Sequence, residues 1–457
     1  MASIVTENLK QNLIQPVIDD IRTGTSPAFY LGIGKSNAWA NASDSAPSPL
    51  NNVLEENNFR RNLQSVIKIN TASFVVKRYN WTTNTVYTQY DDTKLLSDYP
   101  ESEPFYVMNL NQSVYMCLQT GRNAAGDIVA STVEPTSENV DPFGTSDGYI
   151  WKYLYTVSAL DANFYMTQNF IPVGKINSVD SNSTGTENKQ FQVQQNAQDQ
   201  MITSFVVMDS GSSYSANCKI NVNGVYDPFI NVTVNAGKIS KVEYHPDSST
   251  FHYRSNLDGA VLQTNDSTGS GAIIRPIFST GQGVGANAIN DLKSESILIN
   301  SKIIGNQSDF ITSQDFRQIG IIKGLRDSSN GTFWTQNTGQ CLYSMTLDSI
   351  GSSFTKDGEI LGATSGAKAW VDNVDGSTIH YHQYDSTGFL NFVAGEVINE
   401  VGSTGSGKIA SGSAKILPEV SPRTGEILYI DNKSAIVRTV GQTEDIKIVI
   451  KLDNCSW

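Results

Sequence analysis

The chain has 457 residues, a net charge of -13, 39% hydrophobic residues and only 17% charged residues. Such a length indicates several domains, and the acidic balance argues against nucleic-acid binding, which requires a surplus of Lys and Arg. Abundant Ser, Thr, Asn, Gln and Gly favour a mainly β (α+β), multidomain fold with antiparallel sandwich-like or barrel-like domains and a few short helices.

Neither a membrane span nor a secretory leader is expected. No stretch approaches about 18 consecutive apolar residues, and residues 1–20 are too polar and acidic for a signal peptide, which predicts synthesis in the cytoplasm. The four cysteines lie more than 100 residues apart, a spacing that favours buried free thiols over a zinc motif or a disulfide framework. They are Cys117, Cys218, Cys341 and Cys455.

Residues 6–22 form the clearest predicted helix, which we expect Pro16 to break or kink. Its apolar residues recur every four positions, as on one face of a helix: Leu9, Leu13, Val17 and Ile21. The apolar run "AFYLGIGKSNAW" at 28–39 predicts a strand, and residues 54–63 predict a short helix. The latter contains Arg60-Arg61, which together with Lys77-Arg78 are the only adjacent basic pairs.

Between residues 66 and 157 the sequence alternates short β-branched or aromatic runs with polar turns. In "DGYIWKYLYTV" the aromatic residues occupy every second position, and so share one face of a strand: Tyr149, Trp151, Tyr153 and Tyr155. Such a ladder can be a platform for sugars, but it more often belongs to a core or an inter-domain contact.

Two later regions resemble β insertions. Residues 177–200 are polar and nearly free of aliphatic clusters, as expected of a linker or a domain boundary, and a small all-β domain is predicted after them, from about 200 to 280. A second Gly/Ser-rich β region is predicted from about 332 to 417, and two strands, 425–430 and 444–452, close the chain.

Two segments raise the question of a nucleotide site. "VGSTGSGKIA" at 401–410 matches seven of the eight positions of the phosphate-binding loop, but Ile409 replaces the hydroxyl that would hold magnesium. "GIGKS" at 32–36 has the hydroxyl but carries Phe29 where the first glycine belongs. The twin segment "STGSGAII" at 267–274 has Ala272 in place of Lys408. We therefore expect glycine turns between strands, not phosphate loops.

The search for catalytic chemistry yields no assignment. "GTSDG" would make Ser146 a nucleophile on a strand-to-helix elbow, but a strand follows it, so a polar turn is expected. His380 and His382 could share a strand face as metal ligands, although no third ligand is nearby. Adjacent carboxylates occur at Asp19-Asp20, Glu55-Glu56 and Asp91-Asp92. We predict no enzyme, and no catalytic, cofactor-binding or metal-binding residue.

Several of these strands resemble, in this order, the baseplate wedge proteins of T-even-type contractile-tailed phages, the gene product eight family. The resemblance rests on "AFYLGIGKSNAWAN", "VVKRYNW", "VYMCL", "DGYIWKYLYTV", "FRQIGII" and "GEILYIDNKSAIVRTVGQTEDIKIVIKL". It covers about half the chain, and the two Gly/Ser-rich β regions depart from it.

The resemblance implies a structural virion subunit of the tail baseplate, without catalysis or cofactor. It implies a homodimer that links other wedge proteins around the tail tube, with no nucleic acid or membrane as partner. It also implies a discontinuous wedge core at 1–175, 286–330 and 423–457, an inserted β domain at 176–285 and a second inserted β region at 331–422. The alternative is a receptor- or carbohydrate-binding tail protein that uses the aromatic ladder and the insertions; a third hypothesis is a tail-associated glycan hydrolase.

Overall fold

The computed structural model describes residues 6–39, 43–180, 182–222, 225–226, 230–244, 262–305, 309–312 and 315–451. Strands hold 41% and helices 12% of the chain, which confirms the predicted mainly β, multidomain fold. The chain forms two compact units: the first comprises Met1–Asn12, Ser73–Leu298 and Val449–Trp457, and the second comprises Leu13–Ala72 and Ile299–Ile448. The three domain ranges predicted from sequence use other boundaries and stay a prediction.

Helix α1 spans Glu7–Thr23, as predicted, and it continues through Pro16, so Pro16 does not break it; a kink there stays a prediction. A helix tolerates the loss of one N–H donor where its remaining hydrogen bonds and its packing hold it. Its buried apolar side chains are Ile18 and Ile21, each 1% exposed, whereas Leu13 is 65% exposed. The four-residue repeat therefore identified the helix but not the face that packs.

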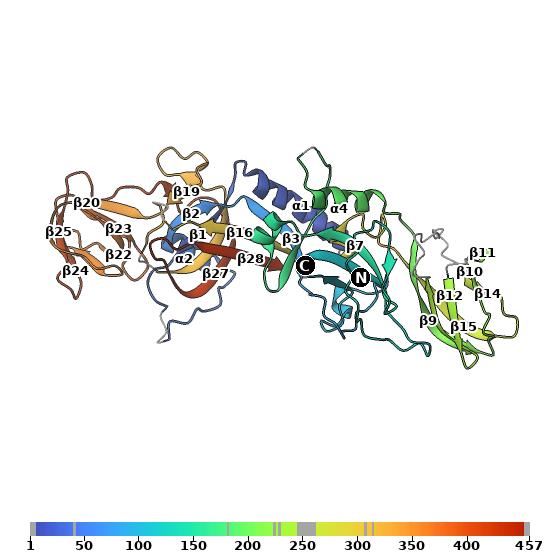
Figure 1. Ribbon diagram of the computed structural model, residues 1–457. Helices are drawn as coiled ribbons and strands as arrows, with labels where there is room; N and C mark the ends of the chain where they lie inside the picture. The colour runs from blue at the N-terminus through green and yellow to red at the C-terminus, as the bar shows by residue number, and fades with distance from the viewer. Residues whose placement is uncertain are drawn as a thin grey trace, which may run out of the picture. The chain divides into compact units, whose positions relative to one another are not determined.

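The second unit contains a five-stranded antiparallel sheet (Figure 1). Its strands, in spatial order, are β19 (Thr338–Gln340), β2 (Leu63–Lys68), β1 (Phe29–Gly34), β17 (Asp315–Lys323) and β27 (Glu426–Val437). Gly32 and Gly320 face each other across β1 and β17. A Cβ atom at Gly320 would lie 2.6 Å from the ring of Phe59, so glycine is required for the close approach of this buried side chain.

Phe59 belongs to α2 (Val53–Asn62), the short helix predicted from sequence. Its first turn is capped by Asn52, whose Oδ1 accepts the N–H of Glu55 at 2.8 Å. Two acidic residues in the first turn and Arg60 and Arg61 in the last complement the helix dipole.

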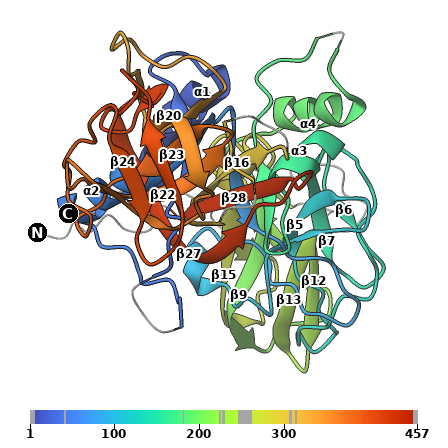
Figure 2. The same ribbon diagram turned by 90° about the vertical axis from the view of Figure 1, so that its left-hand side faces the viewer.

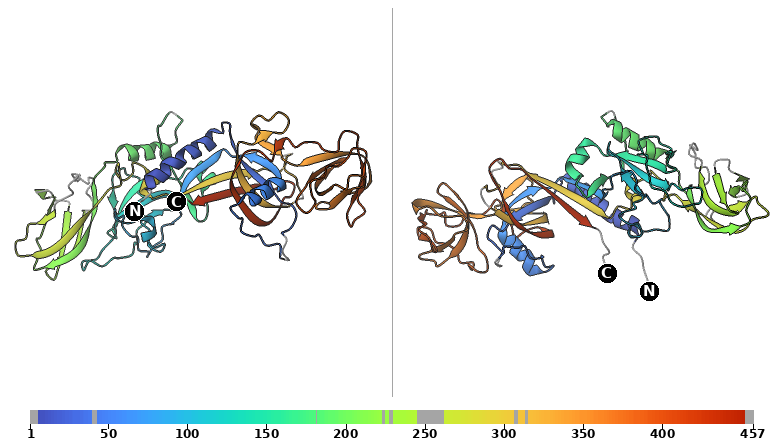
Figure 3. Two further views of the ribbon diagram at one scale, coloured as in Figure 1. Left: turned by 180° about the vertical axis from the view of Figure 1, so that it is seen from behind. Right: turned by 60° about the horizontal axis from the view of Figure 1, so that its bottom comes forward.

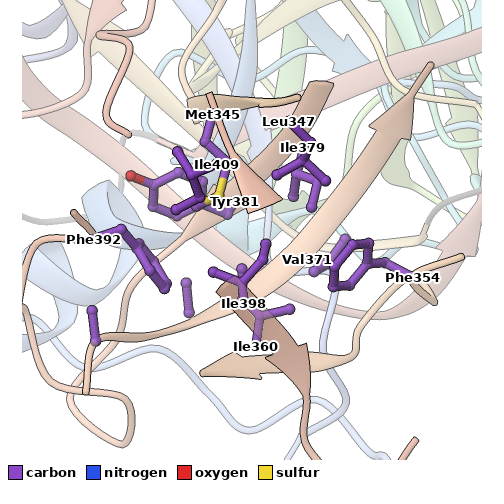
Figure 4. Close-up of a cluster of buried hydrophobic side chains, with 12 residues drawn as sticks. Met345, Leu347, Phe354, Ile360, Val371, Ile379, Tyr381, Phe392, Ile398 and Ile409 are labelled. Atoms are coloured by element: carbon purple, nitrogen blue, oxygen red, sulfur yellow. The ribbon is translucent and has the colours of Figure 1, made fainter. Parts of the chain in front are cut away.

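A closed six-stranded barrel in the same unit confirms the predicted barrel-like element. Around the barrel the strands are β20 (Tyr343–Ser352), β23 (Thr378–His382), β22 (Lys368–Asp375), β21 (Glu359–Gly362), β24 (Val397–Glu400) and β25 (Ser406–Ile409). Four of them are labelled in Figure 2. Every second residue of β24 is buried, so Ile398 points into the barrel while Val397 is 43% exposed. Figure 4 shows the mainly aliphatic side chains that fill it.

The first unit contains a four-stranded antiparallel sheet with an aromatic core. Its strands are β4 (Tyr106–Met108), β5 (Ser113–Gln119), β7 (Ile150–Thr156) and β6 (Phe143–Gly144). Short helices lie at α3 (Ala159–Tyr165), α5 (Ala288–Asp291) and the 3₁₀ turn Leu96–Asp98.

Helix α4 (Gly185–Gln195) lies within residues 177–200, for which the sequence predicted a linker or domain boundary and no helix. Thr184 and Glu187 form a capping box, each side chain accepting the backbone N–H of the other. The helix buries Val193 in the aromatic core, and Gln194 exchanges hydrogen bonds with the backbone of Ile176 at 2.6 and 2.9 Å. This polar helix packs through one aliphatic residue and through amides whose hydrogen bonds are satisfied. Such packing was not predicted from the sequence because the segment has no cluster of aliphatic residues.

The remaining strands complete both units. β9 (Ile202–Ser212) and β15 (Ser270–Phe278) form a long antiparallel pair, seen in Figure 1 and again in Figure 3. Shorter sheets are β12 (Ile230–Asn235) with β13 (Lys238–Tyr244), β10 (Ile220–Val222) with β11 (Val225–Tyr226) and β14 (Leu262–Thr264), and β18 (Arg326–Asp327) with β26 (Val420–Ser421). A four-stranded sheet has the order β28 (Glu444–Lys451), β16 (Ser296–Ile303), β3 (Thr71–Lys77) and β8 (Phe170–Val173). Every helix in the described ranges is too short or too polar to cross a bilayer.

Candidate functional site

The segment resembling a phosphate loop is a β-hairpin turn, as predicted. Residues 401–405 connect β24 to β25, and Ile398 pairs with Gly407 across the two strands. Gly402 has φ +76°, a conformation that a Cβ atom disfavours. Lys408 lies exposed on β25 and no helix follows it, so the backbone N–H groups needed to hold phosphates are absent from this described turn.

The twin segment at 267–274 is also a turn between strands, β14 and β15, but its backbone differs. Here Gly271 has a positive φ of 83°, whereas the equivalent Gly407 does not. A Cβ atom at Gly269 would lie 2.1 Å from the ring of Tyr214. Both turns therefore use one glycine for a positive φ and at least one other for close approach, but the glycine with the positive φ stands at a different position in each turn.

"GIGKS" forms a buried corner at the end of β1. Lys35 has φ +62°, donates to Asn37 Oδ1 at 3.1 Å and lies 4.8 Å from the ring centre of Trp39. Burial and the nearby positive charge of Arg317 lower the pKa of Lys35. Ser36 donates to the carboxylate of Asp372 at 3.1 Å. Both side chains are committed to structure, which leaves neither to bind a phosphate.

The aromatic ladder of β7 is a core face, which removes the sugar platform that motivated the carbohydrate-binding alternative. Tyr149, Trp151 and Tyr153 are 0% exposed and Tyr155 is 4% exposed. Tyr149 and Trp151 stack at 5.6 Å, and the Tyr149 hydroxyl donates to the carbonyl of Val129 at 2.6 Å. The opposite face of β7 is buried too, so no ring of this ladder faces solvent.

Ser146 lies in the polar turn between β6 and β7, as predicted, and not on a nucleophile elbow. The structural residue of this turn is Asp147, whose carboxylate accepts hydrogen bonds from Ser131, Thr132 and Val133. Burial opposes its ionisation, but these hydrogen bonds outweigh burial and lower the pKa of Asp147.

The adjacent carboxylates serve structural roles. Asp91 and Asp92 both pair with Arg275, each at 2.7 Å. The other two pairs lie in helices: Asp19-Asp20 in α1 and Glu55-Glu56 in the first turn of α2.

His380 and His382 do not form a metal site with each other. His380 Nδ1 lies 2.6 Å from the amide of Gln340, and His382 Nδ1 lies 2.7 Å from Asp372 Oδ2. Across the described ranges, no group of three or more His, Cys, Asp or Glu side chains is placed to hold a metal.

Three of the four cysteines are free thiols and buried, as predicted: Cys117, Cys218 and Cys341. Burial raises the pKa of all three thiols, which keeps them protonated and unreactive. Cys455 lies outside the described residues.

The candidate site that the structure adds is a cavity of about 440 Å³ in the second unit. It lies between α2, the ends of β20 and β23, and the segments near 389, 415 and 422. Four basic side chains line it: Arg60, Arg61, Lys415 and Arg423. Three aromatic side chains also line it: Tyr343, Tyr381 and Phe389. None of its lining residues is acidic, although the whole chain carries a net charge of -13. We call it the basic cavity.

The two arginines from α2 are held in place by other parts of the unit. Arg60 donates three hydrogen bonds to backbone carbonyls of residues 422–425, and burial lowers the pKa of its guanidinium. Arg61 forms an ion pair with Asp385 at 2.6 Å and lies 4.9 Å from the ring centre of Phe389. These contacts build the wall of the basic cavity.

Lys415 and Arg423 form fewer hydrogen bonds than Arg60 among the described residues. Lys415 donates to Asn391 Oδ1 at 2.8 Å and lies 4.7 Å from the ring centre of Tyr343. Burial, and then the positive charge of Arg423, lower the pKa of Lys415. Arg423 forms no hydrogen bond or ion pair within the described part of the chain. The repulsion between the two side chains would be relieved by a bound anion.

Behind the cavity lies a buried polar cluster around Asp372, which is 0% exposed. Its carboxylate faces Ser36 at 3.1 Å, Gln64 at 3.4 Å and His382 at 2.7 Å. The serine contacts the carboxylate and not the imidazole, so the arrangement is not that of a catalytic triad. His382 also lines the cavity, is 4% exposed, and its Nε2 has no hydrogen-bond partner within the described part of the chain.

Sequence reasoning did not find this cavity. The only signal was the adjacent pair Arg60-Arg61, because Lys415 and Arg423 lie more than 350 residues later in the sequence. No motif links these positions, which the fold of the second unit brings together.

Comparison with known families gives no assignment: no protein-family model matches the chain, and a search of curated protein sequences likewise returns no match.

Proposed function

We propose that the protein is a structural subunit of the baseplate wedge of a contractile phage tail. In this proposal it is synthesised in the host cytoplasm, forms a homodimer, and links other wedge proteins around the tail tube in the virion. It acts through binding surfaces and has no catalytic activity or cofactor.

The observation that carries the proposal is that segments resembling the wedge family pair with one another as strands. β1, from "AFYLGIGKS", pairs along its whole length with β17, from "FRQIGII". β17 pairs in turn with β27, from "GEILYIDNKSAIV". β5, from "VYMCL", pairs with β7, from "DGYIWKYLYTV". Pairing strands must keep compatible side chains, so a family framework would preserve such segments together.

The regions that depart from the family support the same proposal. The closed barrel lies within residues 343–409 and has its own hydrophobic core. The pair of β9 and β15 lies in the other departing region. Self-contained β elements of this kind can be added to a framework without changing its sheets, and they offer surfaces for further partners.

Size-exclusion chromatography with light scattering tests the proposal on the full chain, alone and co-expressed with the other tail proteins. We expect a dimer that associates with partner wedge proteins. A stable trimer that binds none of them would contradict the proposal.

A further inference from the structure

We propose that the basic cavity is a docking site for a segment of another tail protein that carries both acidic and apolar side chains. The inference rests on the proposed function in one respect, namely that the partner is a tail protein. The chemistry of the partner follows from the cavity itself.

Charge complementarity identifies the acidic part of the partner. Arg60, Arg61, Lys415 and Arg423 line one cavity without a carboxylate among its lining residues. Of these four cations, only Arg61 has an ion-pair partner among the residues that the structure describes, namely Asp385. An acidic chain with a net charge of -13 repels anions over most of its surface, so a local excess of cations gives anionic partners a defined place to bind.

Exposed apolar residues that adjoin the lining residues in sequence identify the apolar part. Phe389, which lines it, is 45% exposed and is followed by Leu390 at 61%. Lys415, which also lines it, is followed by Ile416 at 41% and Leu417 at 57%. Exposed apolar side chains next to arginine and tyrosine are typical of protein interfaces and of little use for a small inorganic anion.

The contacts that the basic side chains already make favour carboxylate side chains over a phosphate group as their ligand. Arg60 already donates hydrogen bonds to three carbonyls, so its guanidinium is not free to form a bidentate contact with a phosphate. Arg423 is exposed and remains available, and Lys415 is held over the ring of Tyr343. Two separate cations at the edge of an aromatic cavity suit carboxylates spaced along a peptide.

The polar cluster around Asp372 gives the cavity a fixed inner wall. The Asp372 carboxylate lies within hydrogen-bond distance of His382 Nδ1, at 2.7 Å, and His382 Nε2 has no hydrogen-bond partner among the described residues. A buried polar atom without a partner is costly, and a bound peptide group could satisfy it.

A fluorescein-labelled peptide of Glu, Asp and Leu, titrated with the full chain and followed by fluorescence anisotropy, tests the proposal. The same peptide with Lys in place of its acidic residues is the control probe. We expect the acidic peptide alone to bind, and the double variant Lys415→Glu with Arg423→Glu to weaken binding about tenfold or more.

A matched double variant separates the cavity from the overall charge. Lys408→Glu with Lys238→Glu changes the net charge equally at two exposed positions outside the cavity, and we expect it to bind the peptide like the wild type. Circular dichroism and urea unfolding establish that both double variants remain folded. Equal weakening in the two variants would overturn the proposal, and so would an absence of binding to the wild type. Binding of inorganic phosphate or ATP at Lys415 and Arg423 without peptide binding would also overturn it, and would indicate a small-anion site.

The light-scattering experiment distinguishes this inference from the proposed function. If the wild type dimerises and associates with tail proteins, and the cavity variant associates equally well, only the docking inference fails. If the wild type neither dimerises nor associates with any tail protein, the proposed function fails, whatever the peptide shows.

Discussion

The barrel of β20 to β25 and the sheet of β4 to β7 show two ways of using strands with alternating side chains. In the barrel the alternation separates inside from outside: Ile398 is fully buried and its neighbour Val397 is 43% exposed. In the sheet, Trp151 and its neighbour Ile150 are both buried. The same period of two therefore does not reveal whether the second face of a strand is covered.

The difference arises from what lies against each strand. A closed barrel fills its interior with its own side chains, here mostly Ile, Val and Ala, and needs no cover outside. The open sheet buries the aromatic face of β7 with help from Tyr87 and from Val193 of α4. An aromatic ladder seen in a sequence is thus evidence for a core as long as another segment can cover it.

The two regions also differ in how burial affects the pKa of a carboxyl group. Burial would raise the pKa of Glu396 in the barrel, but the N–H groups of Val393, Thr364 and Ser365 outweigh it and lower the pKa. In the first unit, burial raises the pKa of Asp291 to about 7. Hydrogen bonds outweigh burial at Glu396, whereas burial outweighs the hydrogen bonds that are donated to Asp291.

The largest expected effect is that of Trp151→Ala. Removing this 0% exposed side chain from the aromatic core should lower the free energy of unfolding by about 3 to 5 kcal/mol, measured by urea denaturation. Leu110→Ala, at a position 90% exposed in the same unit, should change it by less than about 0.5 kcal/mol. A stable Trp151→Ala variant that had lost glycan binding would revive the carbohydrate-binding alternative and break the comparison.

The barrel should show a smaller effect with a sharper contrast between neighbours. Ile398→Ala should cost about 2 to 4 kcal/mol in urea denaturation, because it leaves a cavity inside the closed barrel. Val397→Ala, one residue away on the outer face, should cost well under about 1 kcal/mol. Equal losses would mean that the outer face is covered, as in the aromatic sheet.

The pH dependence of stability should reveal Asp291. Its carboxyl holds a proton more tightly in the folded chain than in the unfolded chain, so the free energy of unfolding falls as pH rises from about 4 to about 7. Asp291→Asn should remove most of this fall. Urea denaturation across that range measures it, with exposed Asp199→Asn as the control. An unchanged slope in Asp291→Asn would refute the assignment.

The smallest effects are expected in the barrel turn. Gly402→Ala should cost about 1 kcal/mol, because a Cβ at φ +76° meets no atom within 4 Å and only the backbone is strained. Lys408→Ala should leave thermal unfolding unchanged, and a calorimetric titration with ATP should show no heat of binding. Measurable ATP binding that Lys408→Ala abolishes would restore the phosphate-loop hypothesis.

Local features of the fold were predictable where short-range patterns decide them. The helix at 54–63, the strand of "AFYLGIG" and the glycine turn at 401–405 follow from capping, apolar runs and turn chemistry, and all three occur in the structure. Helix α4 was missed because its stability depends on tertiary contacts: Val193 in the aromatic core and Gln194 against Ile176. Helix α1 was predicted, and only its continuation through Pro16 was not; Pro16 removes one donor from a helix that packs through Ile18 and Ile21.

By itself, the sequence determined the mainly β class, the buried free thiols of Cys117, Cys218 and Cys341, and the turns that only resemble phosphate loops. These depend on composition and on neighbours within a few residues. The tertiary structure alone decided which side chains are covered and which distant cations meet. Arg60 and Arg423 line one cavity because α2 and the segment after β26 fold together, and burial and charge clustering depend on such long-range packing, which no local pattern encodes.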